Sequence, residues 1–295
     1  MKNQAMVMVM SLTLVGFFLS SCGGGKNEDF DKATFLLSQG GGVNGLKASA
    51  IVQPYLSSAD VMTRIRAARI FAGGKINAAG LDGAKFLANM AHGQSGGNTI
   101  NFLKNILVAL VPVKVSGRIV DSRSTEEAGI AAETYLQESV AAIESVRSLA
   151  AYVAITSGNV SYCSSNKRLC REKESLEVVL ANSHFFRALN VAIRLSSLGS
   201  SAFKDEECLD FFQTSPSYIN TFSASLFSAR SHYALAGLDD KLFEGANGAL
   251  DAENSKPGEL IDDVQNEVDP DKDGLIPGTE LEKAGVICDY LKTQE

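Results

Sequence analysis

The chain has 295 residues, 45% of them hydrophobic and 21% charged, with a formal net charge of −7. Beyond the amino terminus no apolar run approaches membrane-spanning length, which disfavours a polytopic membrane protein. Residues 251–295 carry thirteen Asp or Glu and four Lys, so this tail has a charge of −9 and the rest about +2. An acidic tail on a nearly neutral body argues against nucleic acid as a partner and favours cations at the carboxyl terminus.

A secretory signal is predicted at the amino terminus. Lys2 precedes an apolar core from Ala5 to Leu19, and Leu19-Ser20-Ser21-Cys22 follows. The core has about fifteen residues, whereas a permanent transmembrane helix needs roughly twenty. A retained transmembrane anchor is therefore the weaker interpretation.

The run from Leu19 to Cys22 resembles the lipobox of bacterial lipoproteins. The resemblance implies a lipid attached to the thiol of Cys22, cleavage before it, and acylation of the new amine. Several acyl chains give stable membrane anchoring. In such lipoproteins of Gram-negative bacteria an aspartate after the cysteine often signals inner-membrane retention, and Gly23 here favours the outer membrane, facing the periplasm. The alternative is an ordinary secreted protein.

Four regions are expected along the chain. Residues 1–21 form the signal peptide, and residues 22–30, rich in glycine and polar residues, form a lipidated flexible tether. Residues 31–250 form a helical domain, and residues 251–295 form an acidic calcium-binding tail. The expected fold class is all-α, a helical hairpin bundle or short solenoid with a carboxyl-terminal helix-loop-helix.

Apolar residues at three- and four-residue steps predict most of the helices. In Asp60–Ala72, Gly73-Gly74 is expected to end the helix. Ser124 and Glu127 form a capping box that opens a helix to about Thr156, whose apolar face is interrupted by Arg147. Further helices are expected at Asp31–Ser38, Leu46–Leu56, Leu81–Ala91, Thr99–Leu110, Glu172–Leu198 and Ser217–Ala236, with two short ones near the end and a brief strand pair within Val113–Val120.

A possible repeat appears in the first part of the chain. Shifting Phe35–Gly40 by thirty-four places gives Arg69–Gly74, and both are expected to be helix ends closed by glycine. Ala33 to about Met90 loosely resembles the tetratricopeptide-like front of some proteobacterial lipoproteins, through LLSQGG, IVQPYLSS and RIRAARIFAGG. The resemblance implies stacked helix hairpins with a concave surface that binds peptides or proteins. Generic helical-bundle packing is the alternative.

Four cysteines remain after Cys22, namely Cys163, Cys170, Cys208 and Cys288. An even number in an exported chain predicts two disulfides. Of three possible pairings, Cys163 with Cys170 and Cys208 with Cys288 is preferred. A zinc site is disfavoured because no pair has Cys-x-x-Cys spacing.

One motif predicts metal chemistry. The segment from Asp269 to Glu280 matches the calcium-loop template D-x-[DN]-x-[DN]-G-x5-E at every specified place. Calcium prefers six to eight oxygen ligands, and the expected donors are side chains and one backbone carbonyl: Asp269, Asp271, Asp273, Leu275 and Glu280.

This segment resembles EF-hands and bacterial calcium repeats akin to thrombospondin type 3. Glu259–Val268 and Thr279–Leu291 are the expected flanking helices. Pro277 occupies the ninth loop position, where an oxygen side chain commonly acts, so a weak affinity is expected. The alternative is an acidic solvated turn that binds no metal.

Motifs for catalysis lack the required context. Gly93–Gly97 spells G-x-S-x-G around Ser95, near His92, but follows a predicted helix instead of a strand. Gly40–Gly45 spells G-x-G-x-x-G and also follows a helix, so a helix-ending loop is expected. His184 is expected to be packed. No catalytic residue is assigned.

The expected function is that of a non-catalytic, membrane-anchored helical interaction or assembly factor with a protein partner and one structural calcium site. A small-molecule or lipid-binding protein is one alternative, and a hydrolase with an unrecognised site is another.

Overall fold

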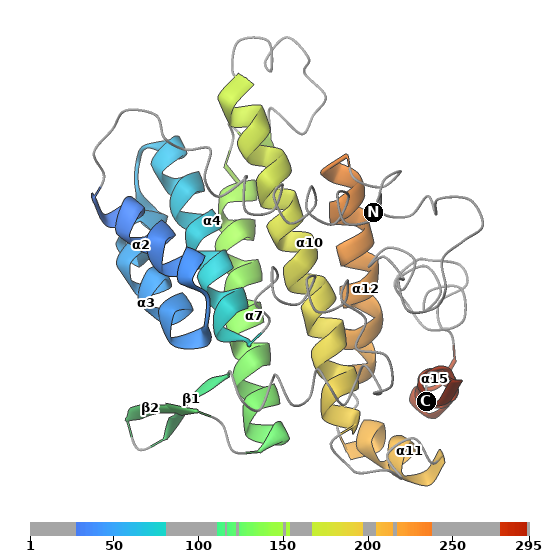
Figure 1. Ribbon diagram of the computed structural model, residues 1–295. Helices are drawn as coiled ribbons and strands as arrows, with labels where there is room; N and C mark the ends of the chain where they lie inside the picture. The colour runs from blue at the N-terminus through green and yellow to red at the C-terminus, as the bar shows by residue number, and fades with distance from the viewer. Residues whose placement is uncertain are drawn as a thin grey trace, which may run out of the picture.

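The computed structural model describes residues 28–80, 111–115, 117–121, 124–149, 152–153, 167–196, 205–214, 217–237 and 278–293 (Figure 1). Within these residues the chain forms eight α-helices, one 3-10 helix and two short strands. The predicted all-α class is therefore confirmed.

The long helices pack side by side in chain order. Each of α2, α3, α4, α7 and α10 packs against the next helix of the series, which ends at α12, and α11 packs with α15 beyond α12 (Figure 1). The bounds are α2 Glu28–Gln39, α3 Gly42–Val52, η1 Gln53–Ser57, α4 Val61–Ala78, α7 Thr125–Arg147, α10 Lys167–Ser196, α11 Asp205–Thr214, α12 Ser217–Leu235 and α15 Glu280–Thr293.

Helix α2 begins earlier than the sequence predicts. Its first turn holds Glu28, Asp29 and Asp31, and negative charge stabilises a helix amino terminus. Phe30 in the same turn is buried against Tyr55, with ring centroids 5.0 Å apart. Residues 28–30, assigned from the sequence to the tether, therefore belong to the packed body.

The prediction that Gly73-Gly74 ends a helix is wrong, because α4 continues to Ala78. Gly74 faces α3 so closely that an added Cβ would lie 2.5 Å from the carbonyl oxygen of Gly45 and 2.3 Å from Ser49 Oγ. The glycine thus allows two helix backbones to approach each other. Consequently the segments Phe35–Gly40 and Arg69–Gly74 do not end alike, since only α2 stops at its glycine.

The predicted strand pair is confirmed. Strand β1 (Pro112–Val115) pairs antiparallel with β2 (Arg118–Asp121), in the register Val113 to Val120. Gly117 in the turn has a φ of 80°, a conformation that glycine adopts without steric cost. The hairpin is attached to α7, where the hydroxyl of Tyr135 donates to the carbonyl of Pro112 at 2.8 Å.

Helix α7 begins as predicted and ends early. The Glu127 amide donates to Ser124 Oγ at 3.1 Å, and this hydroxyl donates to the Glu127 carboxylate at 2.8 Å. The predicted continuation to Thr156 is wrong, because the helix ends at Arg147 and the chain turns at Leu149, whose carbonyl accepts from the Tyr152 amide. The turn directs Tyr152 into the core, where it is 1% exposed.

The carboxyl-terminal half contains three helices that were predicted, α10, α12 and α15, and one that was not. Helix α10 begins five residues before the expected Glu172, and α12 matches the expected Ser217–Ala236 within one residue. Helix α11 had no sequence prediction. The predicted helices Leu81–Ala91, Thr99–Leu110 and Glu259–Val268 lie outside the described residues.

Two apolar clusters form the core. The larger joins α4, α7, α10, α11, α12 and α15, and the smaller joins α2 and α3 to α4 and to Ala142 of α7. Among the helices of the described ranges, none is both long enough and apolar enough to cross a membrane.

Candidate functional site

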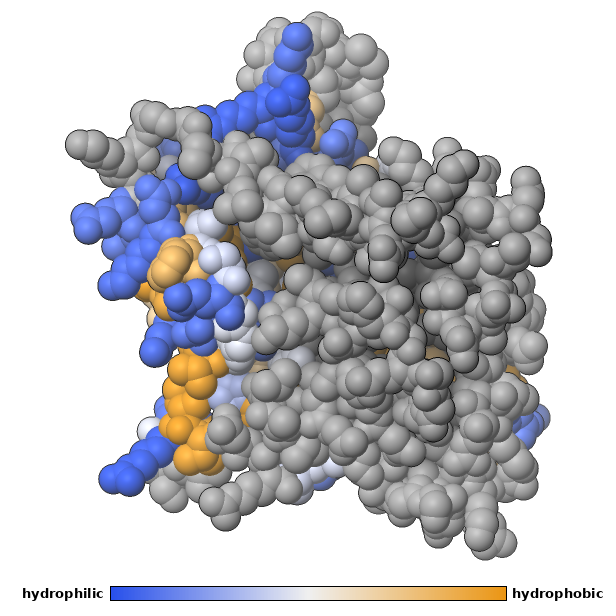
Figure 2. Space-filling model, in the orientation of Figure 1, coloured by the Kyte–Doolittle hydropathy of each residue, from blue (hydrophilic) through white to orange (hydrophobic). Residues whose placement is uncertain are grey.

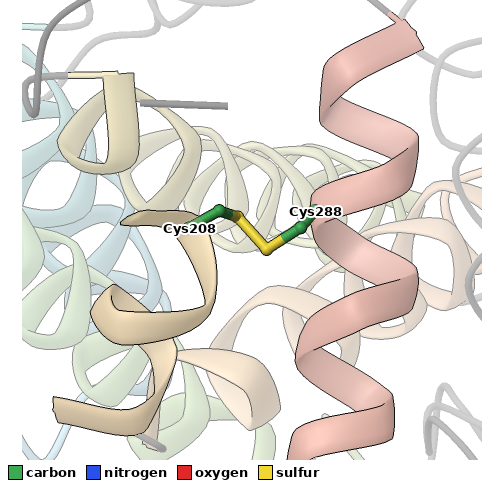
Figure 3. The surroundings of a disulfide bond; sticks show 2 residues. All are labelled: Cys208 and Cys288. Carbon is green, nitrogen blue, oxygen red and sulfur yellow. A yellow bond between two sulfur atoms is a disulfide. The ribbon is translucent and has the colours of Figure 1, made fainter. Parts of the chain in front are cut away.

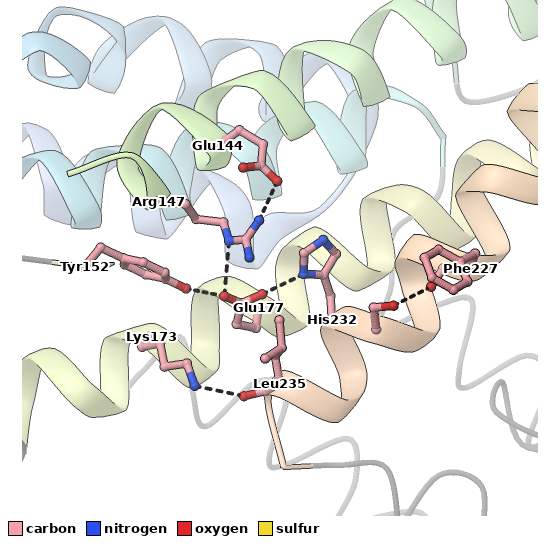
Figure 4. A network of polar contacts seen from close by, with 9 residues as sticks. Glu144, Arg147, Tyr152, Lys173, Glu177, Phe227, His232 and Leu235 are labelled. Carbon is pink, nitrogen blue, oxygen red and sulfur yellow. Dashed lines mark hydrogen bonds and ion pairs between the residues drawn. The ribbon is translucent and has the colours of Figure 1, made fainter. Parts of the chain in front are cut away.

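A buried polar network joins α7, α10 and α12 around the carboxylate of Glu177 (Figure 4). Glu177 lies on α10, in the apolar stripe between Leu176 and Val179, and its side chain is fully buried. One oxygen, Oε2, lies 2.7 Å from His232 Nδ1 of α12. The other, Oε1, accepts from the Tyr152 hydroxyl at 2.5 Å and from Arg147 Nε at 3.3 Å.

The network keeps Glu177 ionised inside the core. Burial by itself would raise the pKa of Glu177, but hydrogen bonds from His232 and Tyr152 and the charge of Arg147 together lower it below its ordinary value. Burial and the Glu177 carboxylate raise the pKa of Tyr152, so its phenol remains a hydrogen-bond donor. Arg147 also binds Glu144 at 2.8 Å, which leads the network to the surface of α7.

His184 of α10 lies against the other side of the network. Its ring stacks on that of His232, with centroids 5.6 Å apart and planes 13° from parallel. Its Nδ1 is buried without a hydrogen-bond partner among the described residues. Burial and then the neighbouring His232, Arg187 and Arg147 lower the pKa of His184 to about 3, so the ring is neutral. The prediction that His184 is a packed residue agrees with this placement.

Several ion pairs cross the same helix interfaces. Arg69 of α4 lies 2.6 Å from Glu172 of α10, and both side chains are largely buried. Arg187 of α10 binds Glu133 of α7 at 2.7 Å. Arg194 of α10 pairs with Glu126 near the start of α7. Ion pairs at several positions along α10 therefore fix its register against α4 and α7.

Two kinds of chemistry can be considered for the network. A carboxylate that orients an imidazole is a known arrangement for a general base, and Glu177 with His232 has that geometry. A metal ion shared by the two imidazoles is disfavoured because their lone pairs lie in nearly parallel ring planes and do not converge. No group of three metal-ligating side chains occurs within the part of the chain that the structure describes.

The predicted calcium loop lies mostly outside the described residues, which exclude Asp269, Asp271, Asp273 and Leu275. Glu280 is the first residue of α15, close to the predicted helix start at Thr279. Before it, Gly278 has a φ of 100°, and Thr279 forms a capping box in which its amide donates to the Glu282 carboxylate at 2.7 Å. The exiting helix thus has a well-defined start, and the metal assignment stays a prediction.

The structure contains the expected disulfide between Cys208 of α11 and Cys288 of α15, with Cα atoms 5.9 Å apart (Figure 3). Both cysteines are buried, as are Ala284 and Ile287 on the same side of α15. Cys170 is disulfide-bonded as well, and its expected partner Cys163 lies outside the described residues. The disulfide prediction is therefore confirmed for Cys208 and Cys288.

The remaining predicted sites have different outcomes. Cys22, His92 and Ser95 lie outside the described residues. Gly40 and Gly41 form the α2–α3 turn with φ values of 68° and 83°, as expected of a helix-ending loop, whereas Gly42–Gly45 already belongs to α3.

Sequence reasoning did not identify Glu177 or Tyr152. One signal was present, since Glu177 is a charged residue inside the predicted apolar stripe of its helix, just as Arg147 interrupts the apolar face of α7. Two opposite charges on the apolar faces of neighbouring helices indicate a buried pair.

The chain matches no protein-family model, no curated protein and no solved structure.

Proposed function

We propose that this protein is a lipid-anchored envelope protein whose helical body acts as a non-catalytic interaction or assembly factor. In this proposal Cys22 carries the lipid, the outer membrane holds the anchor, and the body faces the periplasm. Residues Asp269 to Glu280 bind one structural calcium ion. The support for anchoring is the Leu19–Cys22 motif, and the support for calcium is the spacing of the acidic residues.

One observation supports the interaction role: charged groups are directed into the body, and large apolar side chains are directed outward. The charged groups around Glu177 bind each other inside the body, whereas several large apolar side chains are exposed. Phe35 of α2 is 61% exposed, Ile119 of β2 is 54% exposed and Ile130 of α7 is 53% exposed. Figure 2 shows apolar surface at the left edge, on the side that carries α2, α3 and the hairpin. Exposed apolar groups of this kind suit contact with another protein.

Site-specific crosslinking in the native membrane tests the interaction role. A photoreactive residue at Phe35 and another at Ile119 are expected to capture the same protein. The matched control is Gln137, an exposed polar position on α7. Capture of nothing at the two apolar positions, or equal capture at Gln137, would contradict the proposal.

Anchoring and calcium have separate tests. Cys22→Ser is expected to leave an uncut or soluble precursor, and normal maturation with partition into detergent would refute lipidation. Calorimetric titration of the mature chain with calcium is expected to give a Kd of about 10⁻⁴ to 10⁻³ M, lost in Glu280→Gln. Absence of heat at millimolar calcium, or unchanged binding in the variant, would contradict the calcium assignment.

The second candidate is a hydrolase, for which the Glu177–His232 pair is the favourable observation. His232→Asn keeps a donor toward Glu177 but removes the base. Ester hydrolysis by the wild type that disappears in this variant would favour the enzyme over the interaction factor.

A further inference from the structure

The contact between α10 and α12 contains an unusual pair of imidazoles. His184 and His232 come from the two facing helices, and their rings stack with centroids 5.6 Å apart. Glu177 binds His232 at 2.7 Å, so this carboxylate is directed at the second ring of the stack. His184 Nδ1 itself is buried and has no hydrogen-bond partner in the described ranges. His184 as a whole is half-buried, and a proton on its ring would have no counterion among the described residues.

The charged groups that face His184 from each neighbouring helix make such a proton still less favourable. Arg187 contributes positive charge from α10 and Arg147 from α7, and the His232 ring of α12 stacks on His184. Glu133 of α7 binds Arg187 with two hydrogen bonds, at 2.9 and 2.7 Å. Both of these bonds reach Glu133 Oε1, and Glu133 Oε2 has no hydrogen-bond partner among the described residues. Both oxygens of Glu177 are occupied, by His232, by Tyr152 and by Arg147. Each nearby carboxylate thus already has a cationic or hydrogen-bonding partner.

We propose that the contact of α10 with α12 around His184 and His232 is an acid-sensitive joint. Protonation of His184 sets its positive charge against those of Arg187 and Arg147 in a half-buried site, and α12 then separates from α10. The packing of α2 and α3 on α4 is unaffected, because this packing relies on apolar side chains and glycine and not on a titrating imidazole.

The direction of the pH dependence follows from linkage. The ordinary pKa of a histidine is 6.5, whereas the pKa of His184 in the packed joint is about 3. The opened state therefore binds the proton and the packed state does not, so the stability of the joint is complete above about pH 6.5 and falls as the pH decreases below it. At about pH 5.5 the opening equilibrium is expected to be about tenfold more favourable than at about pH 7.5.

Opening of the joint would uncover an apolar face of α12. Its buried side chains include Ile219, Phe222, Leu226 and Tyr233. Helix α12 also contacts α15, which the Cys208–Cys288 disulfide joins to α11. Acid would thus expose a hydrophobic surface at the carboxyl-terminal side of the body and leave the amino-terminal helices folded.

Hydrogen exchange measured by mass spectrometry tests the joint, on the mature protein at about pH 7.5 and 5.5, with intrinsic exchange rates corrected. Protection of residues 217–235 is expected to fall about tenfold, and protection of residues 28–52 is expected to stay within about twofold. His184→Phe keeps a ring in the stack and removes the titration, so its protection is expected to be nearly independent of pH. His92→Gln, which changes the one histidine outside the stack, is expected to behave as the wild type.

A second measurement on the wild type needs no variant. Imidazole NMR signals of His184 are expected to report a neutral ring as long as residues 217–235 remain protected. A His184 ring that titrates near 6.5 while α12 stays protected would overturn the proposal. An equal loss of protection in His184→Phe and in the wild type, or in residues 28–52 and 217–235 alike, would overturn it too.

Discussion

The helix interfaces in the two halves of the body are stabilised by different interactions. Between α3 and α4 the backbones approach closely at Gly45 and Gly74, and Ser49 Oγ lies 3.0 Å from the carbonyl oxygens of Gly45 and Phe71. Between α7, α10 and α12 the core contains the ionised Glu177 and its three partners. The α3–α4 interface depends on glycines, which have no side chain and so let the two backbones approach. The interface of α7, α10 and α12 depends on opposite charges that neutralise each other.

This difference indicates which changes each interface tolerates. A close backbone approach leaves no space for one more methyl group, but it involves no charge and is insensitive to pH. A buried charge network has the opposite properties, because loss of one partner leaves the others unpaired in a medium of low polarity. Matched substitutions in the two interfaces can therefore separate shape from charge.

The largest effect is expected for Glu177→Ala. The variant leaves His232, Tyr152 and Arg147 without their common acceptor, and breaking a buried pair of this kind costs about 4 kcal/mol in the free energy of unfolding. Urea unfolding at about pH 7.5 measures it. Glu174→Ala, at an exposed position one turn earlier on α10, is expected to change the same quantity by less than about 0.5 kcal/mol. Equal changes in the free energy of unfolding for the two variants would show that the Glu177 network contributes nothing to stability.

A somewhat smaller loss is expected for Gly74→Ala. The new Cβ would lie 2.5 Å from a backbone oxygen of α3, so the two helices must move apart at a cost of about 2 to 3 kcal/mol. The control is Gly285→Ala, inside α15, where an added Cβ meets nothing within 4 Å. This control is expected to stabilise the protein slightly, by about 0.5 kcal/mol, because alanine favours helix over glycine. If Gly74→Ala also stabilises the protein, the α3 and α4 backbones leave room for the added methyl group.

The smallest effects come from a buried hydroxyl pair between α7 and α10. Ser139 Oγ and Ser183 Oγ lie 2.7 Å apart, and Ser183 also donates to the Val179 carbonyl. Ser183→Ala leaves the Ser139 hydroxyl unpaired and is expected to cost about 2 kcal/mol, whereas Ser139→Ala leaves Ser183 with a partner and costs about 1 kcal/mol.

The double variant sharpens this comparison. Once Ser183 is alanine, removal of the Ser139 hydroxyl is expected to cost nothing further or to recover part of the loss. Additive losses in the double variant would mean that the two hydroxyls do not interact. The free energies of unfolding of all four proteins provide the measurement.

Features that depend on a few neighbouring residues could be predicted from the sequence. The Ser124–Glu127 capping box, the β1–β2 hairpin and the α12 helix are of this kind. Gly74 could not be read correctly, because a glycine pair after an apolar run is a common helix stop. Its actual role is set by α3, about thirty residues earlier in the chain. The local sequence pattern predicts a helix end at Gly74, whereas packing against α3 keeps this position within the helix.

The candidate site was less accessible to sequence reasoning. Arg147 and Glu177 are visible as charges on apolar faces, but His232 lies 55 residues beyond Glu177 in the chain. Nothing in the spacing of these residues indicates that they meet. Tyr152 joins them only because α7 ends at Arg147, and that end is also a result of tertiary packing.

The bond between Cys208 and Cys288 has a topological consequence. The two cysteines are 80 residues apart, so the bond closes a covalent ring that contains all of α12 and the acidic run up to Glu280. A single proteolytic cut anywhere within this ring opens it but releases no fragment. The carboxyl-terminal region is therefore a loop fastened at both ends, and a nicked molecule would keep its full mass until a reductant is added.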